Sequence, residues 1–533
     1  MRGREMVSSG SDSNNSRGNA STERRADRWQ RVHHVALIGL LVVAFVSHAF
    51  NLFNYPLYLG DEGIYLEQAW AVLREARLSP YTYIYDHAPA GWLVIAAWTV
   101  LLPKQFFTFG MALNSGRVLM LITHVISVFL LYETTRRLVG SRSAGLIAGV
   151  IFSLSPLALF YQRMLLLDNL MALWVLLALY LIVSNRDRVV TLMVSGLVFG
   201  VALLTKENAV FFSPVIGYLL YTSVRGKPFY RFGLVGWAFC AFSVVSAYPM
   251  YAWLKSELLP TGSILGSSPS EHVSLIGTLV WQMSRSQGSI MDPNSLFWAF
   301  SIERWWPKDA ALLVAGAGAT AVNLGLGLAD RSRRRGFLVA SLMSLAYIIY
   351  LARGSVMLDF YVLPLLPFLA MNVGILFGKT LDALPWRILS VTILVLAIGI
   401  IAMVYIQGSQ DHYTLNLVQV QAQQLQYIRQ NVPAKAVMVI DDDLWVDLHE
   451  SNGGEPVFPN ANSHWKVAQD PAIRDKLLHN DWRRIDYVVM SNKMYEVLKQ
   501  NDETLVLEAY QHSRPLARFE KGDVEVEVRQ VIK

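Results

Sequence analysis

Residues 143–184 read SAGLIAGVIFSLSPLALFYQRMLLLDNLMALWVLLALYLIVS, and this stretch decides the class of fold. Its two apolar runs, 143–161 and 165–184, each approach the roughly 20 residues that an α-helix needs to cross the hydrocarbon core of a bilayer. The two charged residues of the stretch, Arg163 and Asp168, both lie near the junction of the runs. Because charged groups are costly inside a membrane, the pattern predicts two spanning helices joined by a turn at one membrane surface.

The same pattern extends over most of the chain. Of the 533 residues, 53% are hydrophobic and 16% are charged, whereas about a quarter of an ordinary soluble protein is charged. Further apolar runs approach spanning length at 34–53, 115–135, 189–205, 207–223, 232–254, 310–329, 336–352, 356–378 and 386–407. The run Gly91–Leu102 has only about half of that length. We therefore expect an α-helical polytopic membrane protein.

The positions of Lys and Arg decide which side of the membrane each loop occupies, because cytoplasmic loops carry an excess of these residues. If Gly91–Leu102 lies on the outer surface without crossing, five later clusters of basic residues next to the spans fall in the cytoplasm. These groups are Arg136/Arg137/Arg142, Arg186/Arg188, Arg225/Lys227/Arg231, Arg331/Arg333/Arg334/Arg335 and Lys379/Arg387. If that run crosses, all of them move outside. The sequence therefore predicts about eleven transmembrane helices, a cytoplasmic N-terminus and a C-terminus outside the cytoplasm.

Composition divides the chain into three parts. Residues 1–32 are rich in Ser, Asn, Gly and Arg, which indicates a disordered cytoplasmic tail. Residues 33–407 form the transmembrane domain, and residues 408–533 are expected to form a small extracytoplasmic α/β domain. The strand patterns of this last part lie at 436–440, 485–490 and 524–531. No glycine-rich fingerprint follows the first two of these runs, so no nucleotide cofactor is expected.

Two local patterns outside the spans carry further predictions. Residues 63–78 predict an interfacial helix that lies on the outer surface of the bilayer. Its polar residues share one face: Glu67, Gln68, Arg74 and Glu75. The acidic run Asp441–Asp443 could bind a cation, but a solvated strand end is the favoured interpretation, because isolated runs of charge are usually solvated.

Charged groups gather at the predicted outer ends of helices, where ionisable residues are candidates for function. They are Asp61, Glu62, Asp86, His87, Arg163, Asp168, Lys206, Glu207, Arg353 and Asp359. In such a set a carboxylate can take a proton from a hydroxyl group, and cations can hold a phosphate. Structural roles are open too: Asp61 and Asp168 as residues that start helices, Glu62 as a helix-dipole partner, and Arg163 and Lys206 as interfacial anchors.

Five short stretches of the sequence carry a family resemblance. They are GDEG at 60–63, YDHAPAGW at 85–92, the turn from Arg163 to Asp168, Thr205-Lys206, and the stretch from Tyr361 to Pro367. In this order, over roughly the first 380 residues, the chain resembles the GT-C glycosyltransferases, especially the protein mannosyltransferase and aminoarabinose transferase group. The resemblance implies a GT-C-like membrane domain that transfers a sugar from a polyprenyl-phosphate carrier to an acceptor hydroxyl at the outer face of the cell (inner) membrane.

The resemblance also implies roles for individual residues. Asp61 would be the catalytic base and Asp168 its partner, and these two would hold a divalent metal ion if one is used. The expected substrate-binding residues are Glu62, Asp86, His87, Arg163, Lys206, Arg353 and Tyr361. The acceptor would be a lipid, a glycan or a protein, and no nucleic acid is expected as a partner.

One position departs from the family pattern, and one rival function stays open. The family pattern has Lys-Pro where this chain has His87-Ala88. Because His is charged only near or below about pH 6.5 unless its pKa is shifted, phosphate binding at this position is in question. The rival is a transporter or flippase of a lipid-linked substrate, which would pair ionisable groups near the middle of the membrane.

Overall fold

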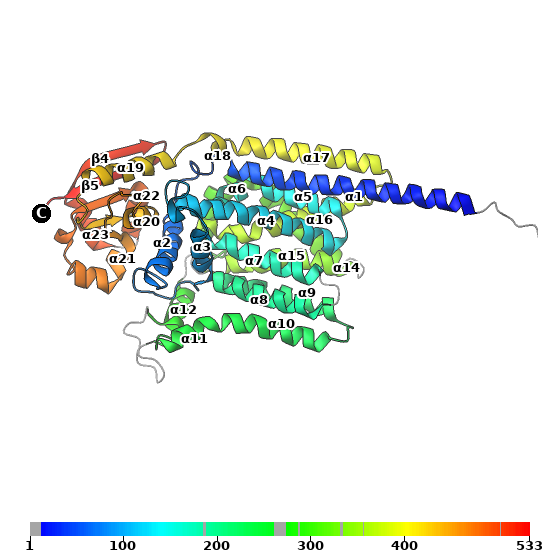
Figure 1. Ribbon diagram of the computed structural model, residues 1–533, viewed down its shortest axis with the longest axis horizontal. Coiled ribbons are helices and arrows are strands. Elements are labelled where there is room, and N and C mark those ends of the chain that lie inside the picture. The colour runs from blue at the N-terminus through cyan, green and yellow to red at the C-terminus, as the bar shows by residue number, and fades with distance from the viewer. Residues whose placement is uncertain are drawn as a thin grey trace, which may run out of the picture.

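The computed structural model describes residues 12–184, 188–260, 273–285, 288–330, 334–354, 357–500 and 503–533. Three of the basic residues used to predict the topology, Arg186, Arg331 and Arg333, lie outside these ranges. The described part is a bundle of long helices with a small α/β domain at one end (Figure 1).

The bundle is built from the predicted apolar runs, and a helix occupies most of each one. Its elements are α1 (Asp12–Ala49), α4 (Leu113–Val139), α5 (Arg142–Leu154), α6 (Pro156–Gln162), α7 (Leu167–Ser184), α8 (Val189–Thr205), η2 (Glu207–Phe212), α9 (Ser213–Val224), α10 (Tyr230–Val245), α11 (Ala247–Leu254), α14 (Trp306–Ala329), α15 (Arg334–Ala352), η5 (Asp359–Leu365), α16 (Leu366–Asp382) and α17 (Arg387–Gly408). Within the described residues, eight spans are long and apolar enough to cross a membrane, or nine if the bent pair α5–α6 counts as one. The figure of about eleven crossings stays a prediction, because α8 and α9 are short.

Helix α1 begins earlier than the sequence suggested. The expected disordered tail covers residues 1–32, but the chain is helical from Asp12 onward. Residues 20–31 consist largely of Ala, Glu, Arg and Gln, which are good helix formers and extend a helix already nucleated in the apolar run. Residues 1–11 lie outside the described part.

The end of the bundle next to the C-terminal domain carries shorter elements. They are α2 (Gly60–Glu75), α3 (Ala90–Val100), η1 (Gln105–Phe107), α12 (Leu275–Ser284), α13 (Leu296–Phe300) and η4 (Ser301–Trp305). Helix α3 corresponds to the half-length run and has 11 residues, about half of what a bilayer crossing requires. Helix α2 lies across the end of the bundle (Figure 1).

The polar face of α2 differs from the prediction. Glu67 and Gln68 were expected to face water, but they are buried, with 1% and 5% of their surface exposed. The reason is tertiary: the C-terminal domain packs onto this side of α2, so that Trp70 Nε1 donates to Glu450 Oε2 at 2.8 Å. Only the last turn, with Arg74 and Glu75, remains exposed.

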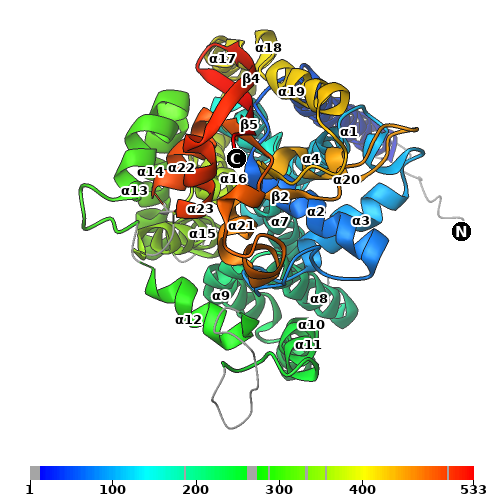
Figure 2. The same cartoon turned by 90° about the vertical axis from the view of Figure 1, so that its left-hand side faces the viewer.

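The C-terminal domain confirms the predicted α/β class. Its strands are β1 (Met438–Ile440), β2 (Ala461–Ser463), β3 (Tyr487–Ser491), β4 (Ser513–Lys521) and β5 (Val524–Val531), in the order β2-β1-β3-β5-β4. Strand β1 pairs in parallel with β2 and β3, and β5 runs antiparallel to β3 and β4. The helices are α18 (Gln410–Thr414), α19 (Val418–Asn431), η6 (Asp442–Leu444), α20 (Trp445–His449), α21 (His464–Gln469), η7 (Ala472–Leu477), η8 (Trp482–Arg484), α22 (Asn492–Gln500) and α23 (Thr504–Gln511). Figure 2 shows the domain in front of the end of the bundle.

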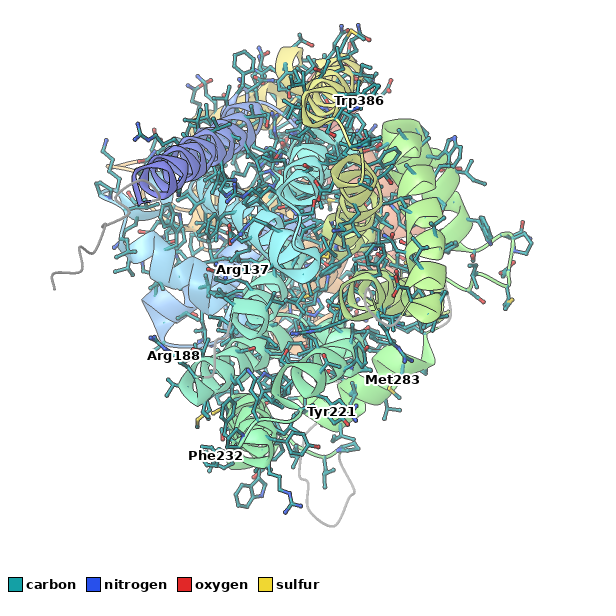
Figure 3. All side chains as sticks on the ribbon, turned by 90° about the vertical axis from the view of Figure 1, so that its right-hand side faces the viewer. Arg137, Arg188, Tyr221, Phe232, Met283 and Trp386 are labelled. Carbon is teal, nitrogen blue, oxygen red and sulfur yellow. The ribbon has the colours of Figure 1, made fainter. Side chains whose placement is uncertain are left out.

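The surface of the bundle is apolar, as a lipid-facing surface must be. Large hydrophobic side chains on outer helices are exposed, for example Phe242 (70%) on α10 and Leu396 (60%) on α17. The end away from the C-terminal domain carries basic residues, among them Arg137 and Arg188 (Figure 3). The cytoplasmic location of this end stays a prediction of the positive-inside argument.

Candidate active site

The residue expected as the base, Asp61, lies in the first turn of α2, where that helix meets the C-terminal domain. A pocket of about 310 Å³ opens here and is lined by both domains, including Asp61, Asp441, Asp442 and His464. Asp61 is partly buried. Burial raises the pKa of its carboxyl group to about 6, although the nearby Lys206 and His87 act in the opposite direction. Such a carboxylate is ionised at neutral pH and is still a useful base.

The second expected carboxylate, Asp168, forms a buried ion pair. Lys206 Nζ lies 2.5 Å from Asp168 Oδ2, and the exposed fractions of the two side chains are 3% and 0%. Asp168 is in the first turn of α7 and Lys206 caps the C-terminal end of α8, so the packing of these helices fixes the pair. The Lys206 ammonium group also lies 4.3 Å from the centre of the Tyr361 ring.

Asp61 and Asp168 act on a common neighbour. Burial, followed by the charges of Asp61 and Asp168, raises the pKa of Tyr65 well above its usual range. The charges of both carboxylates therefore act on Tyr65, which is buried on α2. Asp168 contacts Lys206, which lies beside the Tyr361 ring, and the Lys206 charge also acts on Asp61, although these residues are far apart in sequence.

His87, which replaces the lysine of the family pattern, has an acidic partner. Its Nδ1 lies 3.4 Å from Glu207 Oε2, and Glu207 Oε1 accepts a hydrogen bond from the Ala88 amide at 2.6 Å. Burial opposes protonation of the imidazole, but Glu207 and Asp86 outweigh it, so the pKa of His87 is raised. Glu207 therefore favours the charged imidazolium at this position.

Arg353 lies at the edge of this region. Its guanidinium group stacks 3.8 Å from the centre of the Tyr350 ring and donates to the Tyr350 carbonyl oxygen. The Tyr350 ring is in turn 6.0 Å from that of Tyr361. Arg353 is exposed, so a ligand can reach it.

Glu62 does not fit the expected role in substrate binding. It has no exposed surface, and its carboxylate forms a two-point contact with Arg117, at 3.0 Å to Nε and 2.8 Å to Nη2. It also accepts hydrogen bonds from the amides of Leu59 and Leu165, which joins the start of α2 to the second outer turn. With no exposed surface and both oxygens held by Arg117 and backbone amides, Glu62 has a structural role. Arg117 was missed, although a lone Arg inside a predicted span is a signal for a buried partner.

Arg163 is likewise removed from the expected phosphate site. Its guanidinium group is fully buried and donates only to backbone carbonyl oxygens among the contacts described. These belong to Ser47, Phe50, Tyr55 and His412. The side chain therefore ties α1 and the following turn to the start of the C-terminal domain, and both of its terminal nitrogens are already engaged by carbonyl oxygens.

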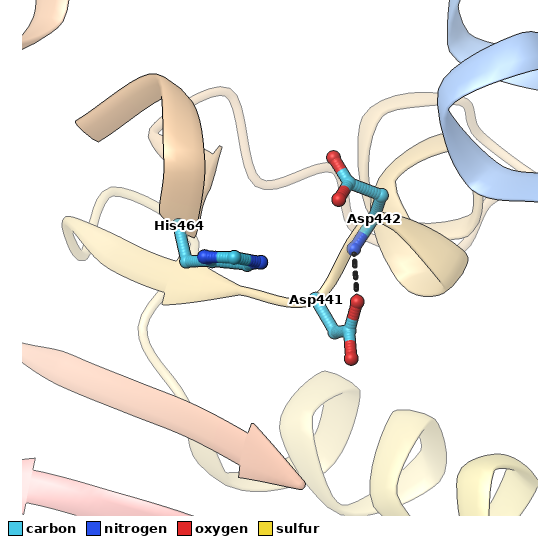
Figure 4. Close-up of side chains that lie close together, drawn as sticks. All are labelled: Asp441, Asp442 and His464. Atoms are coloured by element: carbon cyan, nitrogen blue, oxygen red, sulfur yellow. Dashed lines mark hydrogen bonds between the residues drawn. The ribbon is translucent and has the colours of Figure 1, made fainter. Parts of the chain in front are cut away.

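The acidic run after β1 also differs from the favoured interpretation as a solvated strand end. Asp442 and Asp443 are 2% and 5% exposed, because the run packs against α2. A Cβ atom on Gly63 would lie 2.1 Å from the Asp442 carbonyl oxygen, so the second glycine of GDEG is required by this contact. Among the described residues, Asp441, Asp442 and His464 form a group whose potential metal-ligating atoms lie within 4.8 Å of one another (Figure 4). The sequence placed a possible metal at Asp61 and Asp168 instead, but one oxygen of Asp168 is occupied by Lys206.

Comparisons with known proteins show what the chain is similar to. Residues 86–253, less than half of the chain, match the family model of dolichyl-phosphate-mannose-protein mannosyltransferases. No curated protein matches the chain.

Solved structures extend the similarity to nearly the whole chain. ArnT from Cupriavidus metallidurans bound to undecaprenyl phosphate superimposes with a TM-score of 0.60 at 16% identity, over 94% of this chain and 98% of that one. The oligosaccharyltransferase AglB from Archaeoglobus fulgidus, in complex with an inhibitory peptide and a dolichol-phosphate, gives a TM-score of 0.58 at 12% identity, over 91% and 72%. A complex of the Archaeoglobus fulgidus oligosaccharyltransferase with Zn and sulfate gives a TM-score of 0.53 at 14% identity, over 85% of this chain and 67% of that one. The resemblance expected from the sequence is confirmed, and the chain has the fold of the GT-C glycosyltransferases.

Proposed function

We propose that the chain is a membrane glycosyltransferase that transfers a sugar from a polyprenyl-phosphate carrier to an acceptor hydroxyl at the outer face of the cell membrane. The observation that carries this proposal is the setting of Asp61. A partly buried carboxylate with a pKa of about 6 faces a pocket at the end of an apolar bundle, and the cations Lys206 and His87 lie close enough to stabilise its charge.

The chemistry needs a base and a group that holds the leaving phosphate. Asp61 accepts the proton of the acceptor hydroxyl while the acceptor oxygen forms a bond to the anomeric carbon of the sugar. The bond between that carbon and the phosphate oxygen breaks, and the electron pair leaves with the lipid phosphate. Lys206, His87 and Arg353 supply the positive charge that stabilises this phosphate. Asp168 holds Lys206 in place, Asp86 supports the charge of His87, and Tyr361 packs beside the ammonium group.

The proposed orientation follows from the distribution of charge. Basic residues at the bundle end away from the C-terminal domain support a cytoplasmic location for that end. The pocket and the domain 408–533 then lie outside the cytoplasm, where the sugar of a carrier lipid in the outer leaflet is within reach. The exposed apolar surface of the bundle offers contacts for the prenyl chain.

The direct test is to incubate purified protein in nanodiscs with a panel of undecaprenyl-phosphate and dolichyl-phosphate sugars and to follow the release of lipid phosphate. We expect at least one donor to be consumed by the wild type, and the loss of turnover in Asp61→Asn. If no sugar is released but vesicles carrying the protein move a labelled carrier lipid between leaflets, the flippase replaces the transferase as the function.

A further inference from the structure

The edge of the C-terminal sheet that faces α2 brings three metal-ligating side chains together. Strands β1 and β2 are parallel neighbours, and Ile440 is paired with Ser463. The residues that directly follow this pair, Asp441 and His464, therefore leave the sheet side by side at the same edge. Asp442 comes next in the chain, and Figure 4 shows the His464 ring turned toward the two aspartates.

His464 is oriented from outside this group. Its Nδ1 lies 3.1 Å from Glu503 Oε2, and the Glu503 side chain is 3% exposed. A histidine that binds a metal through one ring nitrogen usually donates the other N–H to a carboxylate, which fixes the ring and makes the free nitrogen a better ligand. The Glu503 contact leaves Nε2 for a ligand on the side of Asp441 and Asp442.

A second observation comes from α2, on the opposite side of the group. Glu67 is 1% exposed, and neither of its carboxylate oxygens has a hydrogen-bond partner of normal geometry. Its charged neighbours include Asp442 of this group and Lys466. One lysine does not balance the negative charge of Glu67, Asp441 and Asp442, so a bound cation would lower the cost of burying these carboxylates.

We propose that Asp441, Asp442 and His464 bind a divalent transition-metal ion at the junction of the two domains, in the pocket that contains Asp61. Two carboxylates and one imidazole suit Zn²⁺ or Mn²⁺ better than Mg²⁺ or Ca²⁺, which prefer oxygen ligands alone. Three protein ligands leave at least one coordination position for water or a substrate oxygen, as in catalytic rather than structural zinc sites.

The contacts around the site explain how the domain presents these ligands to the pocket. Trp465 Nε1 donates to Asp442 Oδ1 at 3.0 Å, and the Asp442 amide donates to Asp441 Oδ1 at 2.9 Å. Asp470, at the end of α21, accepts hydrogen bonds from the amide and hydroxyl groups of Thr82. The site is thus held against the outer loop of the transmembrane domain, and the ion would stabilise this junction.

The test measures metal binding without donor or acceptor, so its result does not depend on the proposed function. Full-length protein in nanodiscs is stripped with EDTA, titrated with Zn²⁺, Mn²⁺, Mg²⁺ or Ca²⁺, dialysed, and assayed for bound metal and for Tm. We expect one Zn²⁺ or Mn²⁺ ion per chain and a higher Tm with the ion. The double variant Asp442→Asn/His464→Gln and the single variant Asp441→Asn should bind at least tenfold more weakly, since they remove ligands or ligand charge.

The matched control is Asp475→Asn/His512→Gln, which removes the same two side-chain types from exposed positions of the same domain. It should bind as the wild type does. The Mn²⁺ spectrum of the wild type provides a readout that needs no variant, because it should show coupling to one imidazole nitrogen. Absence of stoichiometric binding in the wild type would overturn the proposal, and so would binding that is lost in Asp61→Asn but retained when Asp442 and His464 are replaced.

Discussion

Replacing Asp61 by Asn separates a catalytic carboxylate from a helix-starting residue, because Asn caps helices as well as Asp does but cannot accept a proton at neutral pH. General base catalysis contributes about 10²- to 10⁴-fold, so we expect turnover to fall by that factor. The structure adds a pH dependence. With its pKa raised to about 6, Asp61 is about 90% ionised at pH 7 but only about 10% ionised at pH 5.

Wild-type turnover at low acceptor concentration should therefore fall about tenfold between pH 7 and pH 5. A base with the ordinary pKa of an aspartate would still be about 90% ionised at pH 5 and would show almost no loss. The assay is release of lipid phosphate in nanodiscs between pH 5 and pH 8, with Asp475→Asn as the control for loss of a carboxylate. Turnover that is constant from pH 7 to pH 5, or an Asn variant with near-normal turnover, would refute the assignment.

Stability gives an independent check on the same substitution. The pKa of Asp61 is higher in the folded protein than in the unfolded chain, so the folded state binds more protons between about pH 4 and pH 6. The contribution of this group to stability is therefore present at low pH and is lost as the pH rises through about 6. At pH 8 we expect Asp61→Asn to have a Tm at least as high as the wild type, and at pH 4 the two should agree. A Tm that drops at pH 8 would indicate a structural carboxylate.

Other variants test the remaining assignments. Glu62→Gln should lower Tm strongly, because breaking a buried ion pair such as that with Arg117 costs about 3–5 kcal/mol. The KM for donor, measured on the protein that remains folded, should stay unchanged. A changed KM at unchanged Tm would restore Glu62 to the substrate site. His87→Lys should keep turnover at pH 7 and retain it at higher pH than the wild type, since Lys stays charged there. His87→Ala should weaken donor use. Equal activity of the wild type and both variants would exclude a role for the charge at position 87. In a protein with Cys240 replaced by Ala, an impermeant thiol reagent should label Ser451→Cys on intact spheroplasts but not Arg142→Cys, and the reverse pattern would invert the topology.

Local patterns in the sequence were sufficient for most helices of the bundle and for three of the five strands. Apolar runs located the helices, and β-branched runs located β1, β3 and β5, because both signals arise from neighbouring residues. The contact of Asp168 with Lys206 could have been predicted as well, since both residues lie at helix ends on the same predicted side of the membrane. The family pattern added the expectation that Asp61 belongs with them.

The errors arose where tertiary contacts decide the environment of a side chain. The polar face of α2 is a normal interfacial pattern, and nothing in residues 63–78 shows that a domain more than 300 positions later covers it. The same packing buries Asp442 and Asp443, which as a charge run look solvated. One local signal was available: GDEG places a glycine on each side of Asp61-Glu62, and the Gly63 contact shows that the second is needed for close approach.

The chemistry of the cations explains which of them became structural. A guanidinium group has five donors in a planar arrangement and can satisfy several carbonyl oxygens at once, which is how Arg163 is used, while Arg117 matches the two oxygens of Glu62. Lys206 has a compact charge on a flexible side chain and a single carboxylate partner, Asp168. Its ammonium group can therefore bind a phosphate without breaking a larger set of hydrogen bonds. His87 similarly depends on one partner, Glu207. Cations with a single anionic partner are therefore the better candidates for binding a donor, and the two buried arginines are better assigned to holding the turns at this end of the bundle together.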